Sequence, residues 1–227
     1  MKLGVLFSGG KDSTFACYKA MQKDEVACLI TIFSKNPESY MFHTPNIGLA
    51  EIQAMAIGLP IIEIDTEGKK EEELKELHEA IELAKGRYGI EGVVTGAVQS
   101  VYQSSRIKKI CDELGLKCIN PLWQSDQKKY MMEFISCGFK AIVVGVFSQP
   151  FDESWLGKQI DEKTLDHLLK ISEKYKISLT GEGGEFESFV YDGPIFKKRI
   201  EIEKASRSYK NYNGIYKIEK VSLKEKK

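Results

Sequence analysis

The chain has 227 residues, and its 33 Lys and Arg residues balance 33 Asp and Glu residues, so its formal net charge at pH 7 is zero. Hydrophobic residues make up 42% of the chain and charged residues 29%, close to the values of ordinary soluble domains. This balance argues against an intrinsically disordered chain and against a polybasic nucleic-acid or membrane binder. We therefore expect one large domain or two small ones, each with a proper core.

The targeting and cysteine signals point to one compartment. The apolar run at the N-terminus is broken by Gly9 and Gly10, too early for a signal peptide or for a membrane span of about 20 apolar residues. We therefore expect a cytoplasmic protein without membrane attachment. Its cysteines contain no C-x-x-C pair and are expected to be reduced, buried thiols, with a Cys111–Cys118 redox pair as the alternative. The five are Cys17, Cys28, Cys111, Cys118 and Cys137.

The first half of the chain alternates apolar, strand-like runs with segments of helical spacing. Strand, helix, strand repeated in this way is typical of an α/β fold with a doubly wound parallel sheet. The expected strands are Leu3–Phe7, Val26–Phe33, Ile61–Ile64, Gly92–Thr95 and Lys117–Ile119, and the expected helices cover Ser13–Gln22, Leu49–Ile57, Leu74–Ala84 and Ile107–Leu114.

The pattern changes after Pro121, where the strand-like segments need not belong to a parallel sheet. We place a domain boundary here, with residues 1–122 forming the first domain and residues 123–227 a smaller C-terminal α+β domain. The expected helices start at a Ser125 cap and at Asp161, and the expected strands are Ala141–Phe147, Glu187–Tyr191, Lys198–Ile202 and Ile215–Leu223.

The strongest functional signal is a glycine-rich turn directly after the first strand. Its glycines let the backbone approach an anion, and the helix that follows adds the positive end of its dipole. The position is also right, because ligands of open α/β sheets bind beyond the carboxyl ends of the strands. The turn matches neither a Walker A nor a Rossmann motif. It reads Ser8, Gly9, Gly10, Lys11, Asp12 and Ser13.

This S-G-G-K-D-S sequence resembles the PP-loop of the N-type ATP pyrophosphatases, which cleave ATP between its α- and β-phosphates. The resemblance implies an adenine nucleotide alpha-hydrolase-like, Rossmann-like fold in which the six residues bind ATP. It also implies that Lys11 and Asp12 are catalytic, with Asp12 as a Mg²⁺ contact, so the expected cofactors are ATP and Mg²⁺.

Four further segments narrow the family. They are His43 to Asn46, Gly96 to Arg106, Pro121 to Trp123, and the stretch from Gly181 to Glu187 that reads G-E-G-G-E-F-E. Together, and in this order, they resemble the diphthine–ammonia ligase family, from Met1 to about Pro194. The resemblance implies ATP-dependent amidation of the diphthine carboxylate of translation elongation factor 2, with ammonium as nitrogen source and an acyl-adenylate as intermediate.

The remaining expected ATP contacts are Phe33, His43, Gly96 and Ala97. Gly96 follows a buried strand, so its missing side chain could let a nucleotide lie against the backbone, with a simple turn as the alternative. His43 lies in a loop beside a proline, and is either a nucleotide or substrate contact or an ordinary loop histidine.

Tyr102, Gln103 and Arg106 are the expected substrate-binding residues of the Gly96–Arg106 segment. Arg106 could bind a phosphate or a carboxylate bidentately, with a surface arginine as the alternative. The chain departs from the family pattern at Val101 and Ser104, where an acidic and a basic residue are usual.

The stretch from Gly181 to Glu187 carries three carboxylates, and either binds something cationic or is a solvated loop. Diphthine carries a trimethylammonium group, and the co-substrate is ammonium. We therefore expect Glu182, Glu185 and Glu187 to be catalytic, as cation ligands or general base, and Gly183 and Gly184 to contact the substrate.

Two rival functions stay open at this point. One is a tRNA-modifying PP-loop enzyme of the thiolase or lysidine-synthetase type, although no reactive cysteine pair is recognisable and zero net charge argues against a nucleic-acid partner. The other is a non-catalytic regulator that binds adenine nucleotides, against which the intact Lys11 and Asp12 argue. Elongation factor 2 and ammonium are the expected partners, and the oligomeric state is open, a homo-oligomer included.

Overall fold

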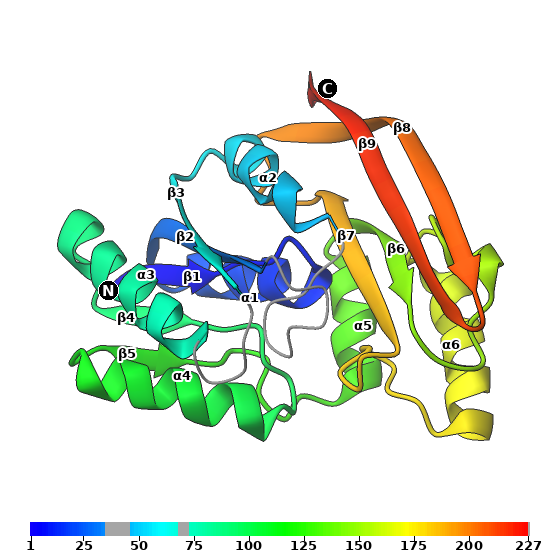
Figure 1. Ribbon diagram of the computed structural model, residues 1–227, viewed down its shortest axis with the longest axis horizontal. Helices are drawn as coiled ribbons and strands as arrows, with labels where there is room; N and C mark the ends of the chain where they lie inside the picture. The colour runs from blue at the N-terminus through cyan, green and yellow to red at the C-terminus, as the bar shows by residue number, and fades with distance from the viewer. Residues whose placement is uncertain (35–45, 68–72, 227) are drawn as a thin grey trace. The chain divides into compact units, whose positions relative to one another are not determined.

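The computed structural model describes residues 1–34, 46–67 and 73–226. The chain forms two compact units, Met1–Gln124 and Ser125–Lys227. Each unit has its own sheet (Figure 1), so each is described by itself.

The first unit is the predicted doubly wound parallel sheet. Its five strands pair in parallel in the order β3-β2-β1-β4-β5, so the chain steps outward from β1 on one side and then returns to β1's other side. The elements are β1 (Lys2–Leu6), α1 (Lys11–Met21), β2 (Glu25–Ser34), a short 3-10 helix η1 (Ile47–Leu49), α2 (Ala50–Ile57), β3 (Ile61–Thr66), α3 (Glu73–Tyr88), β4 (Gly92–Val94), α4 (Val101–Glu113) and β5 (Lys117–Ile119).

The helices of this unit cover both faces of the sheet. One continuous apolar cluster joins α3 and α4 to the side chains that alternate along β2, for example Cys28 and Ile30. The helices α1 and α2 lie on the opposite face (Figure 1), and their buried side chains, such as Phe15 and Ile57, are not part of this cluster. Burial on both faces explains why these strands read as uninterrupted apolar runs.

The second unit is an α+β domain, as predicted. Its four strands are antiparallel, in the order β7-β6-β9-β8. Its core is rich in aromatic rings: Phe151 meets Trp155 edge-on and Phe186 at a tilt. The elements are α5 (Gln127–Ser136), β6 (Lys140–Val146), a 3-10 helix η2 (Glu153–Trp155), α6 (Glu162–Tyr175), β7 (Phe186–Asp192), β8 (Lys198–Lys210) and β9 (Asn213–Glu225).

Helix boundaries follow local capping chemistry. The helix expected from Asp161 begins one residue later, at Glu162, because Asp161 is its cap: its carboxylate accepts the amide hydrogen of Thr164 at 2.8 Å. The predicted Ser125 cap was wrong by one residue: Asp126 caps α5 instead, because its carboxylate accepts the amide hydrogen of Lys129 at 2.8 Å. A carboxylate serves this position as well as a hydroxyl does.

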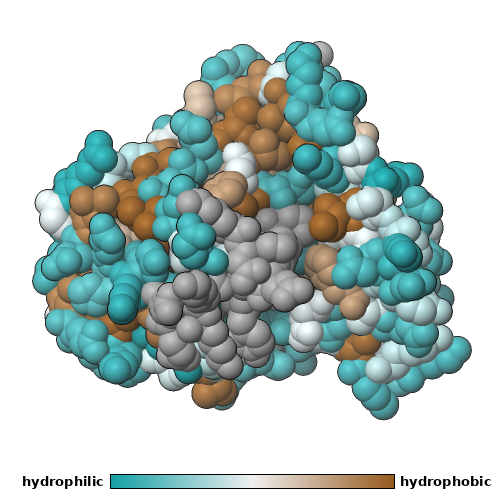
Figure 2. All heavy atoms as spheres, viewed as in Figure 1, coloured by the Kyte–Doolittle hydropathy of each residue, from teal (hydrophilic) through white to brown (hydrophobic). Residues whose placement is uncertain are grey.

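Charged and polar side chains dominate the face shown in Figure 2. None of the helices in the described residues combines the length with the apolar character that a membrane span requires.

Candidate functional site

The site of the first unit lies where the order of its sheet reverses. β1 is bordered by β2 on one side and by β4 on the other, and the chain leaves β1 toward β2 but returns to it from β4. At such a point the loops after the two neighbouring strands diverge and leave a crevice at their carboxyl ends. The loop after β1 carries Ser8 to Gly10, and the loop after β4 carries Gly96 and Ala97.

The glycine-rich turn is held by hydrogen bonds within itself. The Ser8 amide donates to Ser13 Oγ at 3.2 Å, and Ser13 Oγ donates to the Gly10 carbonyl at 3.2 Å. Gly10 is the N-cap of α1 and offers no side-chain cap, so a ligand can take up the first-turn amides that a capping side chain would otherwise bind. The turn therefore has the construction of an anion-binding helix N-terminus.

Lys11 is the charged group inside this turn. It begins α1, its side chain is only 2% exposed, and its Nζ lies 2.8 Å from Asp12 Oδ2. A buried ammonium is costly unless charge and hydrogen bonds compensate it, and the partly exposed Asp12 carboxylate supplies part of that compensation. A phosphate group bound at the turn would supply further compensating negative charge. The buried Lys11 ammonium is therefore consistent with an anion-binding site at this turn.

Gly96 brings the two loops together. A Cβ atom at Gly96 would lie 2.8 Å from the Ser13 nitrogen and 2.9 Å from the Asp12 carbonyl carbon, so glycine is required for backbone to pack on backbone here. The next residue, Ala97, is buried, and its amide donates to Thr95 Oγ1 at 3.1 Å. The structure thus gives Gly96 a packing role, in addition to the nucleotide contact expected from the sequence.

Two residues that sequence reasoning missed donate hydrogen bonds to backbone carbonyls at and just before the glycine-rich turn. Gln53 of α2 is 1% exposed and donates from Nε2 to the Gly9 carbonyl at 2.9 Å. Gly9 has a φ of 75°, and a side chain there would overlap the Gln53 amide. Thr31 of β2 donates to the Phe7 carbonyl at 2.7 Å. The available signal was a polar residue inside an otherwise apolar run, which must find a partner when it is buried.

The structure describes one of the other two expected ATP contacts. Phe33 lies near the end of β2, and its ring lies beside Gly48 of η1, 3.5 Å from the position that a Cβ atom on Gly48 would take. His43 lies outside the described residues.

The expected substrate residues occupy the first turns of α4, which follows β4 and so starts at the same carboxyl edge of the sheet as the glycine-rich turn. The Gln103 amide is used to cap the helix, donating to Ser100 Oγ at 3.3 Å. The Arg106 guanidinium carbon lies 3.5 Å from the centroid of the Tyr102 ring, so the two side chains form one stacked, cationic surface. Ser104, one of the departures from the family pattern, accepts a hydrogen bond from Asn120 Nδ2 at 2.9 Å.

The acidic stretch of the second unit is an ordered loop that leads into β7. Ser178 organises it: its Oγ accepts hydrogen bonds from the Thr180 amide at 3.2 Å and from the Glu182 amide at 3.3 Å. The Gly184 amide donates to the Gly181 carbonyl at 2.9 Å. Hydrogen bonds within the loop therefore fix its conformation.

Glu185 lies at the centre of this loop. Its Oε1 accepts the Ser178 amide hydrogen at 2.8 Å, while its Oε2 is buried and accepts no hydrogen bond within the described residues. Its carboxylate also lies over Gly183, where a Cβ atom would come within 2.6 Å of Oε1. A buried carboxylate oxygen without a partner is costly, so a cation or a proton donor would stabilise it.

The other acidic loop residues are placed differently. Gly184 has a φ of 78° and open space around it, so it is a turn residue. Glu182 lies on the loop and Glu187 on β7 opposite Gly145, and both are partly exposed.

Residues that could hold Mg²⁺ are few. Among the described side chains, no three His, Cys, Asp or Glu residues gather to hold a metal ion by themselves. Mg²⁺ at phosphate sites usually takes one or two carboxylates and fills its shell with phosphate oxygens and water. Asp12 beside a phosphate-binding turn fits that pattern.

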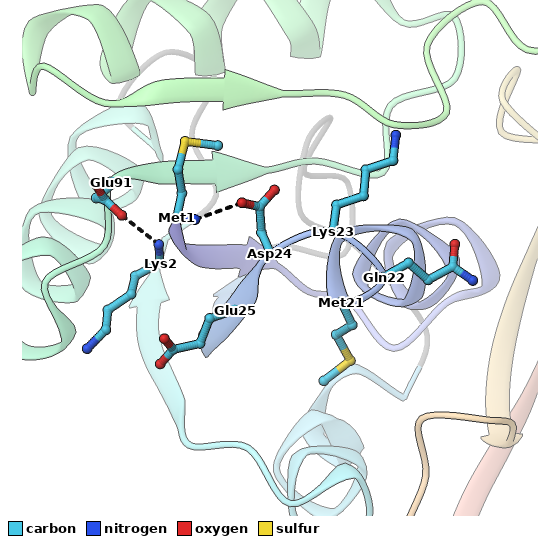
Figure 3. Close-up of a pocket in the computed structure, with 8 residues that line it drawn as sticks. All are labelled: Met1, Lys2, Met21, Gln22, Lys23, Asp24, Glu25 and Glu91. Carbon is cyan, nitrogen blue, oxygen red and sulfur yellow. Dashed lines mark hydrogen bonds and ion pairs between the residues drawn. The ribbon is translucent and has the colours of Figure 1, made fainter.

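A second hollow, of about 570 Å³, lies at the opposite, amino-terminal edge of the first unit's sheet (Figure 3). The Met1 ammonium pairs with Asp24 at 2.7 Å, and the Lys2 amide donates to Glu91 at 2.8 Å. The Asp24 hydrogen bond raises the pKa of the Met1 ammonium. Because these groups satisfy one another at the edge where such sheets do not bind ligands, we assign no site here.

Comparison with known proteins identifies the family. The model of the diphthamide synthase N-terminal domain matches residues 1–118, and that of the C-terminal domain matches residues 126–223. A diphthine–ammonia ligase of Bos taurus is 32% identical over 226 residues, which cover 89% of this chain and 83% of the relative. Those of Mus musculus and Homo sapiens are 33% and 31% identical with the same coverage.

A solved structure, described as that of a predicted subunit of tRNA methyltransferase from Methanocaldococcus jannaschii, is 19% identical with a TM-score of 0.47, and the match covers 86% of this chain and all of that one. The two family models together span nearly the whole sequence, and the chain therefore belongs to the diphthine–ammonia ligase family of diphthamide synthases and is a carbon–nitrogen ligase.

Proposed function

We propose that the chain amidates the diphthine carboxylate of translation elongation factor 2 with ammonium, at the expense of ATP, and releases diphthamide, AMP and pyrophosphate. The observation that carries this proposal is the buried Lys11 ammonium in a glycine-rich helix N-terminus at the reversal point of the sheet. A helix N-terminus of this kind is suited to bind phosphate, and membership of the diphthine–ammonia ligase family supports diphthine as the acceptor.

The reaction takes two steps. A carboxylate oxygen of diphthine attacks the α-phosphorus of ATP. The bond between this phosphorus and the oxygen that bridges it to the β-phosphorus breaks, and an acyl-adenylate and pyrophosphate form. Ammonia then attacks the acyl carbon, loses a proton, and displaces AMP. Lys11 and the first-turn amides of α1 neutralise the charge that builds on the departing pyrophosphate, and the chain otherwise positions the reactants. Bound Mg²⁺ would add charge neutralisation beside Asp12.

The acidic loop supplies the cation-binding chemistry of the second unit. Glu185 Oε2 is buried and lacks a hydrogen bond in the described part of the chain, so an ammonium ion would satisfy it and could leave its proton there. Glu182 and Glu187 are the further ligands for ammonium or for the trimethylammonium group of diphthine, with the backbone of Gly183 and Gly184 beside them. Tyr102, Gln103 and Arg106 would contact the protein substrate, and Phe33, His43, Gly96 and Ala97 the nucleotide.

The test is a reconstitution with ATP and Mg²⁺, with and without diphthine-bearing elongation factor and ammonium. We expect AMP only when both are added, and a decrease of about 1 Da in the factor's mass as a carboxylate becomes an amide. AMP formation that depends on tRNA would instead establish the rival RNA-modifying function, and tight ATP binding without turnover would establish a nucleotide sensor. A cytoplasmic location, where the factor acts, belongs to this proposal.

A further inference from the structure

The acidic loop and the turn between β8 and β9 lie at the same end of the second unit's sheet. Val146 of β6 pairs with Phe186 of β7 on one side and with Gly214 of β9 on the other, and Gly214 pairs with Tyr209 of β8. These pairings place the four residues in one row across the sheet, and Figure 1 shows the start of β7 at the same end of the sheet as the turn between β8 and β9. With neighbouring strands about 4.8 Å apart, three spacings put the start of β7 roughly 14 Å from β8.

Acidic and basic residues are distributed unevenly along the hairpin of β8 and β9. In the half far from the turn, each of four glutamates is paired with a lysine or arginine. Residues 205–218, which we name the hairpin tip, contain no Asp or Glu, while Arg207, Lys210 and Lys217 are exposed there. Lys217 lies near Glu219 of the other half, whereas Arg207 and Lys210 lie closer to the turn. The paired groups of the other half are Lys198–Glu225, Arg199–Glu201, Lys204–Glu219 and Lys220–Glu203.

The turn itself presents an aromatic side chain in an unfavourable conformation. Asn211 and Tyr212 both have positive φ, 51° and 61°, as in the two-residue turn that favours glycine at its second position. Tyr212 nevertheless occupies this second position, and the residue is 45% exposed. A bulky residue at positive φ is an outlier for which the turn alone gives no reason.

The hairpin tip is also fixed to the rest of its unit. The Tyr209 hydroxyl donates to the Phe151 carbonyl at 3.1 Å, and a Cβ atom at Gly157 would lie 2.8 Å from the Tyr216 ring. The Arg207 guanidinium carbon lies 5.7 Å from the centroid of that ring. A surface held in this way loses little conformational entropy when it binds.

We propose that the hairpin tip is a docking surface for an acidic patch of the protein substrate, next to the loop that receives the diphthine side chain. This inference rests on the proposed function, which requires a large protein to dock beside that loop. Tyr and Arg are the residue types that contribute most to protein interfaces. A nucleic acid fits less well, because Tyr209 and Tyr216 are engaged and only Tyr212 of the tip's tyrosines is exposed, whereas single strands stack on several aromatic rings.

Two variants of the hairpin tip test this docking role. Tyr212→Gly removes the ring and leaves glycine where the turn favours it, so the protein should melt at the same or a higher temperature. R207Q/K217Q removes two charges, and K163Q/K170Q removes two exposed charges from α6 of the same unit as the control.

We expect both tip variants to raise the KM for diphthine-bearing elongation factor, and the Kd measured directly for the purified factor, about tenfold. The control should match the wild type, and the KM for ATP should stay constant. The wild-type KM should rise with salt, and R207Q/K217Q should flatten that rise.

Unchanged KM and Kd in both tip variants, with an active wild type, would overturn the docking role and leave the proposed function standing. Tip variants that lose binding to a polyuridylate oligonucleotide, while binding the factor normally, would make the tip a nucleic-acid surface and also overturn it. Without turnover of the factor by the wild type, the proposed function fails, and the direct Kd values still decide the docking role.

Discussion

Gly96 packs directly against the first turn of α1, so that a Cβ atom on Gly96 would lie only 2.8 Å from the Ser13 nitrogen. The opposing atoms are backbone and cannot rotate away, as a side chain could. The loop after β4 and the glycine-rich turn after β1 can therefore pack this closely only because Gly96 has no side chain.

The first prediction is that Gly96→Ala displaces the glycine-rich turn. Overpacking of this kind costs about 1–3 kcal/mol, so we expect a lower free energy of unfolding in urea and an ATP affinity reduced at least tenfold. Gly86→Ala is the matched control, because Gly86 lies in α3 with nothing within 4 Å of an added Cβ. Alanine should stabilise that helix by roughly 0.5–1 kcal/mol. Wild-type ATP affinity in Gly96→Ala would show that the contact has no effect on the site.

The second prediction concerns Lys11, whose ammonium is buried beside Asp12. Lys11→Met keeps an unbranched side chain of similar length and removes the charge that, in the proposed mechanism, stabilises the departing pyrophosphate. Loss of a preorganised charge of this kind typically lowers kcat by about 10²–10³, and we expect that loss in AMP formation with little change in melting temperature. Lys23→Met, at an exposed position just after α1, should retain full activity. Activity within threefold of the wild type in Lys11→Met would remove Lys11 from the mechanism.

The sheet and its two-unit organisation were the predictable part of this protein, because they depend on repeated apolar runs. The apolar runs around Val5, Leu29 and Val93 are short and alternate with helical patterns, as expected of strands that are buried on both faces. The S-G-G-K-D-S turn was equally visible, since paired glycines followed by a lysine, directly after a buried strand, are typical of a turn that binds phosphate.

The contacts that shape the sites could not be predicted in the same way. The hydrogen bond from Gln53 to Gly9 spans 44 residues, so the local pattern can indicate that a buried Gln53 needs a partner but not that the partner is Gly9. Glu185 shows the same limit: composition singled out the three carboxylates of the acidic loop equally. Only the fold reveals that one of them bonds Ser178 with one oxygen and buries the other.

The third prediction separates the two oxygens of Glu185. Glu185→Gln retains an acceptor for the Ser178 amide but loses the charge, so the loop should stay folded while the KM for ammonium rises about tenfold or more. Glu185→Ala also loses the hydrogen bond, which costs about 1 kcal/mol of stability. Glu173→Gln, exposed on α6, is the control for charge. Steady-state kinetics with varied ammonium decide the matter, and a normal KM in Glu185→Gln would assign ammonium to Glu182 or Glu187.

The last prediction concerns the pH dependence of stability. Burial raises the pKa of the Cys17 thiol from its ordinary value of 9.0 to about 12, so the folded protein keeps this proton when the unfolded chain has lost it. The folded state therefore binds more protons between pH 9 and pH 12, and its stability must fall as the pH rises through that window. Each pH unit within this window lowers the free energy of unfolding by about 1.4 kcal/mol.

Cys17→Ala should accordingly lose less stability than the wild type between pH 8 and pH 10, by about 1 kcal/mol, even though the cavity it creates makes it less stable at both values. Urea unfolding of both proteins at the two pH values gives the loss of stability for each. The cost of the cavity does not depend on pH, so it cancels when the two losses are compared. Cys137→Ala, at the partly exposed C-terminal end of α5, leaves the Cys17 thiol in place and should follow the wild type. Equal losses in Cys17→Ala and the wild type would mean that Cys17 can ionise in the folded protein, and that α1 opens far enough to let water reach it.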